Sequence, residues 1–207
     1  HSCFCVRPME RKTLFSCFTG AARRTSGGVS PFAAMCTALA ATVGTGNIAH
    51  RVADILRAAF DVRVLCWNPR RTAAECAAWG YEQIGTLPEL FRRSDFVNVS
   101  ITLCDETRGL INAPVFAAAN PELLLVNTSR GGIVNEHDLY VALTTGQIRA
   151  AASDVFAYEP PASDDPLIHL DNFIATFHIG GSTYESLERV SNRAVDYVFQ
   201  YTGVAER

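Results

Sequence analysis

One short stretch of the chain, GTGNIA at residues 44–49, has the glycine spacing of a phosphate-binding turn. Gly44 permits a tight turn because it has no Cβ, and Gly46 would let a diphosphate approach the backbone closely. Ala49 stands three residues later, where a small side chain allows a helix to pack closely on a strand. The order G-x-G-x-x-A is therefore a candidate dinucleotide fingerprint, whose weight depends on the elements around it.

The elements that flank this stretch are those that the fingerprint requires. Residues 39–43 are mostly apolar and predict a strand, and residues 47–60 have apolar positions at helical spacing. A ligand phosphate would lie at the N-terminus of this helix, against the backbone of Asn47 and Ile48, where unpaired amides and the helix dipole favour negative charge. The strand, turn and helix together predict a dinucleotide cofactor at these residues.

The end of the second predicted strand bears on the choice of cofactor. An acid usually hydrogen-bonds the adenosine ribose at this point, but here Asn68 ends the strand and Arg70 and Arg71 follow it. Loss of the carboxylate removes the repulsion of a 2′-phosphate, and guanidinium groups could bind one. The cofactor is therefore predicted to be NAD or NADP, with NADP at least as favoured. The alternative is that the two arginines only begin a solvent-exposed helix.

From about residue 38 the sequence alternates short β-like runs with helical stretches, which is typical of an α/β fold with a doubly wound parallel sheet of the Rossmann type. Strands are predicted at residues 39–43, 62–67, 96–103, 123–127, 150–155 and 173–176, and helices at residues 47–60, 73–79, 88–93 and 135–145.

A long helix is predicted after the last strand. Ser182 and Glu185 have the spacing of a capping box, and Leu187, Val190 and Val198 lie on one face of the helix that follows. The stripe predicts that this helix packs back on the domain. The chain then divides into a basic, irregular N-terminal extension, a dinucleotide-binding domain and a C-terminal helix, at residues 1–36, 37–181 and 182–207.

Composition narrows the function classes further. The net charge is −3 and 48% of the residues are hydrophobic, which allows a sizeable core and gives the chain as a whole no reason to bind nucleic acid. Residues 1–53 differ, because Glu10 is their only acid against six Lys and Arg. This bias is typical of an organelle-targeting leader or a basic arm, so the expected location is mitochondrial, and otherwise cytoplasmic, with RNA contact by the arm as an alternative. The longest apolar run, residues 32–43, is too short to span a membrane.

The seven cysteines do not form a metal or disulfide framework. None makes a C-x-x-C pair and no histidine lies at zinc-finger spacing from them, so no metal site is predicted. Cys66 and Cys104 fall in apolar runs and are expected to be small buried hydrophobes. Scattered free thiols indicate a reducing compartment.

Four segments, in order along the chain, resemble the D-isomer-specific 2-hydroxyacid dehydrogenases, the family that contains phosphoglycerate dehydrogenase and glyoxylate/hydroxypyruvate reductase. They are VGTGNIAHRVA, SDFVNVSITLCDETRGLIN, LLVNTSRGGIVNEHDLYVALTTGQIRAAASDVFAYEPPASDDPL and ATFHIGGSTYES. The resemblance covers roughly residues 38–202, and the long third segment makes it specific. It implies an NAD(P)-binding domain that acts with a small 2-keto or 2-hydroxy acid.

The resemblance also implies a catalytic set of Arg, Glu and His. The Arg of the family's N-T-x-R-G-G segment falls on Arg130, the Glu of D-V-F-x-x-E-P on Glu159, and the His of T-P-H on His178. A guanidinium can grip the carboxylate and carbonyl of a 2-keto acid, an imidazole can give a proton to the carbonyl oxygen, and a carboxylate can hold the ring's orientation. Asp154 matches the family position that faces the nicotinamide carboxamide.

The chain departs from the family pattern in its turns and in its extent. Thr102 and Phe177 stand where the family has proline, and Phe177 directly precedes His178, where the proline helps to set the backbone. Family members also carry a separate substrate-binding domain, most of it ahead of the fingerprint, and only 43 residues precede Gly44 here. Half of the active-site cleft is therefore expected to be missing, and little activity is expected of this chain alone.

Three functions stay open on these observations. The first is NAD(P)H-dependent reduction of a small 2-keto acid, which Arg130, Glu159 and His178 support. The second is a non-catalytic, dehydrogenase-derived subunit of a larger assembly, which the missing domain and the basic arm support. The third is a module that senses NAD(H), as in the family's corepressor members. A homodimer or a larger protein assembly is expected, and because the chain starts with His1 and not Met, a fragment is a fourth interpretation.

Overall fold

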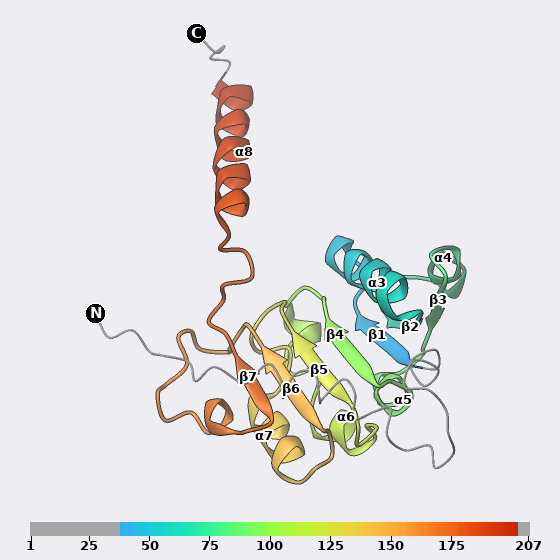
Figure 1. Ribbon diagram of the computed structural model, residues 1–207. Coiled ribbons are helices and arrows are strands. Elements are labelled where there is room, and N and C mark those ends of the chain that lie inside the picture. Colours follow the sequence, from blue (N-terminus) through green and yellow to red (C-terminus); the bar gives the residue numbers. More distant parts are fainter. Residues whose placement is uncertain (1–37, 203–207) are drawn as a thin grey trace.

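The computed structural model describes residues 38–202 of the 207-residue chain. Its centre is a seven-stranded parallel sheet with the strand order β3-β2-β1-β4-β5-β6-β7 (Figure 1). The strands are β1 (Leu39–Val43), β2 (Arg63–Trp67), β3 (Tyr81–Gln83), β4 (Phe96–Val99), β5 (Leu124–Asn127), β6 (Ala150–Ser153) and β7 (Phe173–Ala175). The predicted doubly wound sheet is confirmed, and its order reverses between β1 and β4, where such sheets bind ligands at the carboxyl ends of their strands.

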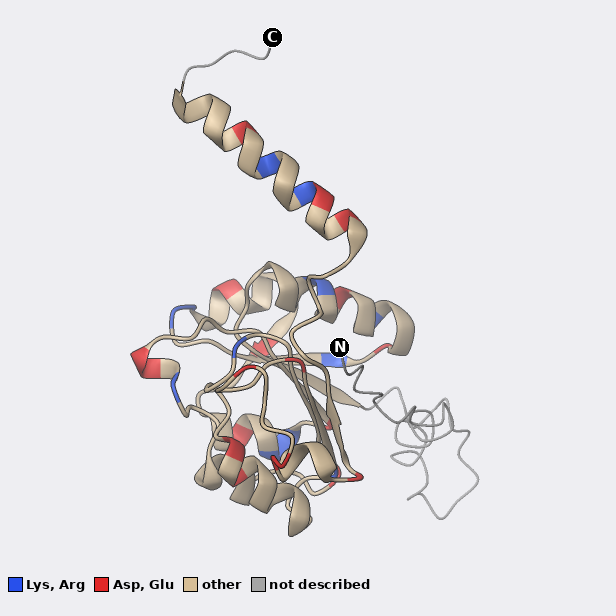
Figure 2. Cartoon of the chain, turned by 90° about the vertical axis from the view of Figure 1, so that its left-hand side faces the viewer, with Lys and Arg blue, Asp and Glu red and all other residues tan. Residues whose placement is uncertain are grey.

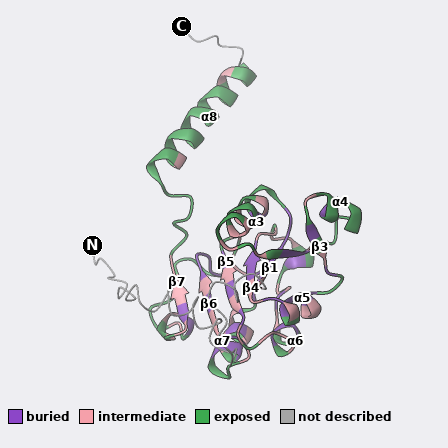
Figure 3. Cartoon of the chain, turned by 45° about the vertical axis from the view of Figure 1, so that its right-hand side comes forward, coloured by how far each residue is buried: buried purple, intermediate pink, exposed green. Residues whose placement is uncertain are grey.

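Helices cover both faces of this sheet. They are α3 (Asn47–Phe60), α4 (Ala73–Ala78), α5 (Leu87–Arg93), α6 (Ala113–Ala117) and α7 (Glu136–Thr144). Helix α3 contacts β1 and β2, and it lies on the opposite side of the sheet from α5, α6 and α7, which contact one another in that order (Figure 1 and Figure 3).

The central strand β1 is buried on both faces of the sheet, whereas burial alternates along β5 and β6, where one face is only partly covered. Leu65, Ala41, Val97 and Leu125 lie opposite one another in register across β2, β1, β4 and β5. Each of these side chains is buried. Continuous apolar runs are typical of parallel strands packed on both sides, which explains why the strands could be recognised in the sequence.

The loop after β4 differs from the prediction. The strand predicted at residues 96–103 ends at Val99. The Thr107 hydroxyl donates to the Thr102 carbonyl at 2.8 Å and accepts from the Cys104 N–H at 2.8 Å, and these bonds fold the segment into a loop. The elements β3 and α6 were not predicted, because three and five residues are too few to show a period.

The C-terminal helix, α8 (Tyr184–Thr202), stands away from the sheet (Figure 1 and Figure 3). The expectation that it packs back on the domain is wrong, since none of its residues is buried and Leu187 and Val190 are 58% and 66% exposed. An apolar stripe shows that a helix has a face to cover, and it does not show what covers it. The cap also lies one residue later than predicted, because the Thr183 hydroxyl accepts from the Ser186 N–H at 3.2 Å.

Residues 1–37 and 203–207 lie outside the described part of the chain. The predicted N-terminal extension at residues 1–36, with its targeting leader or RNA-binding arm, falls there. Within residues 38–202, charges of both signs are scattered over helices and loops (Figure 2). In the same residues no helix has the length and hydropathy to cross a bilayer, and no three His, Cys, Asp or Glu residues gather in a way that could hold a metal ion.

Candidate active site

The turn after β1 has a shape that only glycine fits. Gly44 has φ +98°, and a Cβ at this position would collide with the carbonyl oxygen of Ser100. The Gly44 N–H donates to the Trp67 carbonyl at 2.9 Å, and the Ser100 N–H donates to the Val43 carbonyl at 2.8 Å. The turn is therefore wedged between the chain segments that leave β2 and β4.

The start of α3, by contrast, is open. A Cβ on Gly46 would meet no atom within 4 Å, and in the described residues no side chain caps the helix. Asn47 is exposed and Ile48 is 64% exposed, whereas Ala49 is fully buried and lets the helix lie close to the sheet. The first amides of a helix have no partner within it, so this end has both the room and the donors that a diphosphate needs. The residues present fit a dinucleotide.

The segment after β2 is fastened to this turn by Asn68. The side-chain nitrogen of Asn68 donates to the Thr45 hydroxyl at 2.7 Å, and its oxygen accepts from the Arg70 N–H at 2.8 Å. Both arginines are exposed, but Arg71 forms an ion pair with Glu75 at 3.0 Å, whereas Arg70 acts on the Glu106 carboxyl only through its charge. The structure thus separates the two arginines, because Arg71 is tied to α4.

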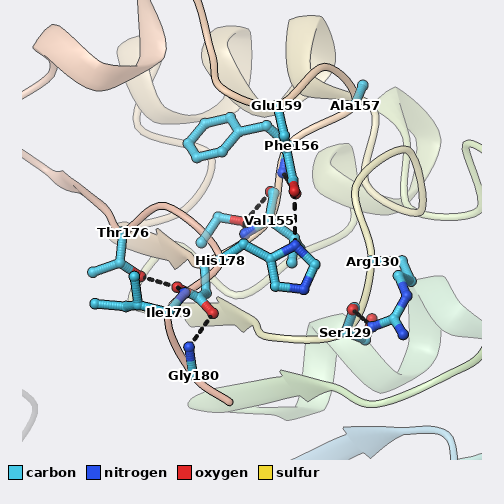
Figure 4. Close-up of polar contacts among 12 residues, drawn as sticks. Ser129, Arg130, Val155, Phe156, Ala157, Glu159, Thr176, His178, Ile179 and Gly180 are labelled. Carbon is cyan, nitrogen blue, oxygen red and sulfur yellow. Dashed lines mark hydrogen bonds and ion pairs between the residues drawn. The ribbon is translucent and has the colours of Figure 1, made fainter. Parts of the chain in front are cut away.

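The other predicted residues lie on loops that follow three neighbouring strands. Arg130 follows β5, Glu159 follows β6 and His178 follows β7. These strands are adjacent and parallel, so their carboxyl ends share one edge of the sheet. A Cβ on Gly131 would collide with the Phe156 carbonyl oxygen, which means that the first two loops touch backbone to backbone. The topology therefore brings all three residues to one edge (Figure 4).

Glu159 and His178 form a direct hydrogen bond. His178 Nδ1 lies 2.7 Å from Glu159 Oε2, and the other carboxylate oxygen accepts from the Phe156 N–H at 2.9 Å (Figure 4). The bond with His178, followed by that from Phe156, lowers the pKa of the Glu159 carboxyl. An ionised carboxylate can only accept, so Nδ1 carries the proton of this bond. Nε2 is then the ring nitrogen that can exchange a proton with a ligand.

A buried carboxylate, Asp154, holds the segment that carries His178. Its oxygens accept from the Thr176 hydroxyl at 2.5 Å, the Ile179 N–H at 3.0 Å and the Gly180 N–H at 2.9 Å. Its carbonyl accepts from the His178 N–H at 2.7 Å. Burial opposes the charged form, but these three side-chain bonds and the nearby His178 outweigh burial and lower the pKa of Asp154. The segment is thereby held with His178 at φ +55°, which is uncommon for a residue with a side chain.

Phe177, at the position where the family has proline, lies between two backbone hydrogen bonds. The N–H groups of Thr176 and His178 donate to the carbonyls of Ser153 and Asp154 at 3.0 and 2.7 Å. These bonds continue the pairing of β7 with β6 past the end of the strand. The backbone that presents His178 is therefore set by bonds to the neighbouring chain, without a proline ring.

The guanidinium of Arg130 is bent back to the backbone of its neighbour, Ser129. Its Nη1 donates to the Ser129 carbonyl at 2.6 Å, and the residue is exposed (Figure 4). The backbone is fixed, because the Asn127 side chain donates to the Arg130 carbonyl at 3.2 Å and accepts from the Ser129 N–H at 3.1 Å. The structure thus places the start of this side chain and leaves the long, exposed end free to rotate toward a bound anion.

Two carboxylates of this region have contacts that sequence reasoning missed. The resemblance predicts a nicotinamide contact for Asp154, and it does not predict that the same side chain anchors the segment of His178. Glu136, at the start of α7, accepts from the Ala157 N–H at 2.6 Å and was not singled out at all. The sequence shows that Asp154 follows an apolar strand and therefore needs hydrogen-bond partners, but it does not show which residues supply them.

Residues 34–180 match the sequence profile of a protein family, the NAD binding domain of the D-isomer specific 2-hydroxyacid dehydrogenases. The chain belongs to this family. The match runs from just before β1 to the loop that carries His178, so it includes both the glycine turn and the loops after β5, β6 and β7.

Curated relatives of this 2-hydroxyacid dehydrogenase domain are longer than the chain. A hydroxypyruvate reductase from Thermotoga maritima is 35% identical over 165 residues, which are 78% of this chain and 52% of that protein. A D-3-phosphoglycerate dehydrogenase from Mycobacterium tuberculosis is 38% identical over 156 residues, 75% of this chain and 29% of that protein. The chain therefore spans about half the length of one and less than a third of the other.

Solved structures agree with this assignment. A D-lactate dehydrogenase from Aquifex aeolicus, in complex with NAD and lactic acid, has a TM-score of 0.71 and 29% identity over 80% of this chain and 54% of that one. The apo D-mandelate dehydrogenase of Rhodotorula graminis has a TM-score of 0.70 and 28% identity over 86% of this chain and 55% of that one.

A second family, the sodium:alanine symporters, matches residues 5–55. This match covers a minor part of the chain. The stretch of it that the structure describes, residues 38–55, forms β1 and most of α3 of the nucleotide-binding sheet. The dehydrogenase family accounts for that stretch, and the symporter match supports no function here.

Proposed function

We propose that this chain supplies the cofactor-binding and proton-donating part of an enzyme that reduces a small 2-keto acid with NAD(P)H. The observation that carries the proposal is the Glu159–His178 hydrogen bond, on the same edge of the sheet as the turn at Gly44 and Gly46. A surface ion pair is common and so is a glycine-rich turn. Their joint presence on one edge supports acid–base chemistry on a ligand that the helix N-terminus holds.

His178 is the proposed proton donor. With Nδ1 bonded to Glu159, the ring is oriented by a carboxylate, and Nε2 gives a proton to the carbonyl oxygen of the substrate. When bound, the nicotinamide would supply the hydride that adds to the carbonyl carbon. Glu159 stabilises the protonated ring before transfer, and in the reverse direction His178 takes the proton of the hydroxyl group.

Arg130 is the proposed partner of the substrate carboxylate. Its guanidinium donates a hydrogen bond to the carbonyl of the neighbouring Ser129, and a substrate carboxylate can displace that bond. A planar guanidinium can bind the two oxygens of a carboxylate at once, which also orients the adjacent carbonyl group. Binding of this kind places the reacting carbon of the substrate relative to His178.

For the cofactor, we propose that NADPH binds at least as well as NADH. Asn68 brings no negative charge to the end of β2, so a 2′-phosphate meets no carboxylate from that residue. Arg70 is the better partner for the phosphate, because Arg71 is already paired with Glu75. At the nicotinamide end, Asp154 Oδ2 accepts a bond from Gly180, and a carboxylate oxygen can accept a second bond, from a carboxamide.

The substrate, the partners and the location of the whole protein are further proposals. The curated relatives are longer than this chain, so we infer that protein outside residues 38–202 completes the cleft and excludes water from it. A homodimer or a larger assembly would provide a setting for such a cleft. The five Lys and Arg against one acid in residues 1–36 favour a mitochondrial address, which a fluorescent fusion of these residues would test.

The test of the function measures binding and turnover separately. NADH and NADPH are titrated by nicotinamide fluorescence, and NAD(P)H oxidation is followed with glyoxylate and with hydroxypyruvate, in the native assembly and with residues 1–207 alone. We expect both cofactors to bind, and we expect His178→Gln to lower turnover in the assembly by a factor of about 10²–10⁴ with cofactor affinity unchanged. The control is His137→Gln, because His137 is an exposed residue of α7.

Two results would contradict the proposal. Cofactor binding without turnover in the native assembly would favour a non-catalytic subunit. Failure of both cofactors to bind would also remove the proposed site at Gly44 and Gly46, and with it the case for a module that senses NAD(H).

A further inference from the structure

Glu136, in the first turn of α7, has a carboxylate that is hydrogen-bonded to the loop after β6. Glu136 Oε1 accepts from the Ala157 N–H at 2.6 Å, across 21 residues of sequence. The helix does not need Glu136 as a cap, because the Asn135 side chain accepts from the Asp138 N–H at 3.0 Å. Asp138 in turn accepts from the Ala113 N–H at 2.9 Å and ties α7 to α6. The main effect of the hydrogen bond that Glu136 accepts is therefore to hold the backbone at Ala157.

Ala157 belongs to the turn that carries Glu159. The Phe156 N–H donates to Glu159 itself, and the next N–H along the chain donates to Glu136. On the other side of the turn, the Phe156 carbonyl lies too close to Gly131 to leave room for a Cβ there. Figure 4 shows Phe156, Ala157 and Glu159 together in this turn, from which Glu159 reaches His178. Two carboxylates and one backbone contact thus hold consecutive positions of the turn.

Glu136 lies in surroundings that disfavour a carboxylate without a partner. It is partly buried and lines a small cavity together with Gly131 and Phe156. Burial raises the pKa of the Glu136 carboxyl, the Ala157 N–H opposes this rise, and the charge of Asp165 adds to it. Because a buried polar group is costly unless it is hydrogen-bonded, the bond to Ala157 offsets the cost of placing the carboxylate here.

We propose that Glu136 is a positioning residue of the reductase reaction, which holds the Ala157 amide so that Glu159 meets His178. The inference rests on the proposed function, because the role it assigns is in proton transfer by His178. Glu136 acts through Glu159 and does not itself touch the reacting atoms. Without Glu136, the turn keeps the bond between Phe156 and Glu159 but loses its second carboxylate, and Glu159 is free to move off the imidazole.

The experiment compares four variants of the full chain. Glu136→Ala removes the acceptor, Glu136→Met removes it while keeping the length of the side chain, and Glu136→Gln keeps an oxygen acceptor without the charge. Asp138→Ala is the matched control, because it removes a carboxylate bond to a distant backbone N–H from the same helical turn. The titration of the Glu159 carboxyl carbon is followed by NMR, since the bond with His178 lowers the pKa of that group.

We expect Glu136→Ala and Glu136→Met to move the Glu159 titration up toward the ordinary value of a glutamate, about 4.3. In the native assembly, the same variants should lower kcat about tenfold or more at unchanged affinity for NADPH. Glu136→Gln should retain most of the lowered Glu159 titration and most of kcat. Asp138→Ala should lower thermal stability and move neither property.

An unchanged Glu159 titration in Glu136→Met would overturn the inference, and this variant also decides the matter if Glu136→Ala does not fold. An equal shift in Asp138→Ala would overturn it as well, because the effect would then be a general loosening of the fold. A shifted titration in an assembly whose parent protein has no turnover would support the positioning of Glu159 and would contradict the proposed function alone.

Discussion

The two ends of the open sheet edge are built in different ways. At the end formed by β6 and β7, the buried Asp154 accepts three hydrogen bonds and holds His178, whose ring is bonded to Glu159. At the end formed by β1 and β2, Gly46 and Arg70 are exposed. Side chains and backbone are tightly joined at the first end, and the second presents open amides and an open arginine.

The difference follows from what each end has to do in the proposed reaction. A group that transfers a proton must be held close to its productive geometry, which requires partners that are already in place. A cofactor phosphate is bound by helix amides, whose positions follow from the strand, turn and helix themselves. Changes at the β6–β7 end should therefore cost folding stability, and changes at the exposed positions Gly46 and Arg70 of the β1–β2 end should alter cofactor affinity at little cost in stability.

A pair of glycines gives the largest expected contrast. Gly131 follows β5 and touches the loop after β6 at the Phe156 carbonyl. Gly131→Ala should lower the free energy of unfolding by about 3 kcal/mol, because the new Cβ would collide with that carbonyl. Gly46→Ala should change it by less than about 0.5 kcal/mol, since the new Cβ meets no atom within 4 Å, but should weaken dinucleotide binding. Urea denaturation and nicotinamide fluorescence measure the two effects. Equal losses of stability would break the comparison.

Asp154 should give the next largest effect. Asp154→Ala removes the acceptor of the Thr176, Ile179 and Gly180 bonds, so we expect a loss of about 2 kcal/mol in the free energy of unfolding, by urea denaturation. The matched change at the other end is Asn68→Ala, which removes the bond to Thr45 and should cost about 1 kcal/mol or less. A larger loss from Asn68→Ala would reverse the order of the two ends.

The pH dependence of stability tests the same carboxylate. The pKa of Asp154 is lowered in the folded protein, so its contribution is complete above the ordinary Asp pKa of about 3.9 and is lost as the pH falls through the lower, folded value. The free energy of unfolding should therefore fall less steeply below about pH 4 in Asp154→Asn than in the parent protein. Identical slopes for the two proteins would count against the assigned hydrogen bonds.

At the β1–β2 end, two neighbouring arginines should differ in effect. Arg70→Ala should weaken NADPH binding about tenfold, or about 1.4 kcal/mol, and leave NADH binding unchanged. Arg71→Ala should have a smaller effect on NADPH, because Arg71 is paired with Glu75. Titration of both cofactors measures this. An NADH affinity more than tenfold above that for NADPH in the parent protein would contradict the role of Arg70.

The smallest effect is expected on α8, which belongs to neither end. Leu187→Asn and Val190→Asn should each change the free energy of unfolding by less than about 0.5 kcal/mol, because both side chains are exposed. Leu125→Ala, in the buried row of the sheet, is the contrasting change and should cost about 2–5 kcal/mol. A loss above 1 kcal/mol in an α8 variant, measured at low protein concentration, would mean that the stripe supports the domain after all.

The patterns that predicted the fold best are those with the strongest local signal. The ranges predicted for the first strand and the first helix, residues 39–43 and 47–60, are those of β1 and α3. The glycine turn between them marked the end of the strand and the start of the helix. The strand predicted at residues 96–103 was too long, because Thr107 folds its second half into a loop by bonds that no periodicity reveals.

The sequence alone therefore determined the existence of every strand except β3, the helix that follows Gly44 and, through the family resemblance, the candidate set that includes Glu159 and His178. Only the tertiary structure decided that Asp154 anchors the segment of His178, that Glu136 holds the turn of Glu159, and that α8 has no partner within the described residues. The physical reason is the range of the interactions. Strand and helix patterns depend on residues a few positions apart, whereas these contacts join residues 21 to 26 positions apart, and the order of strands in the sheet decides whether they meet.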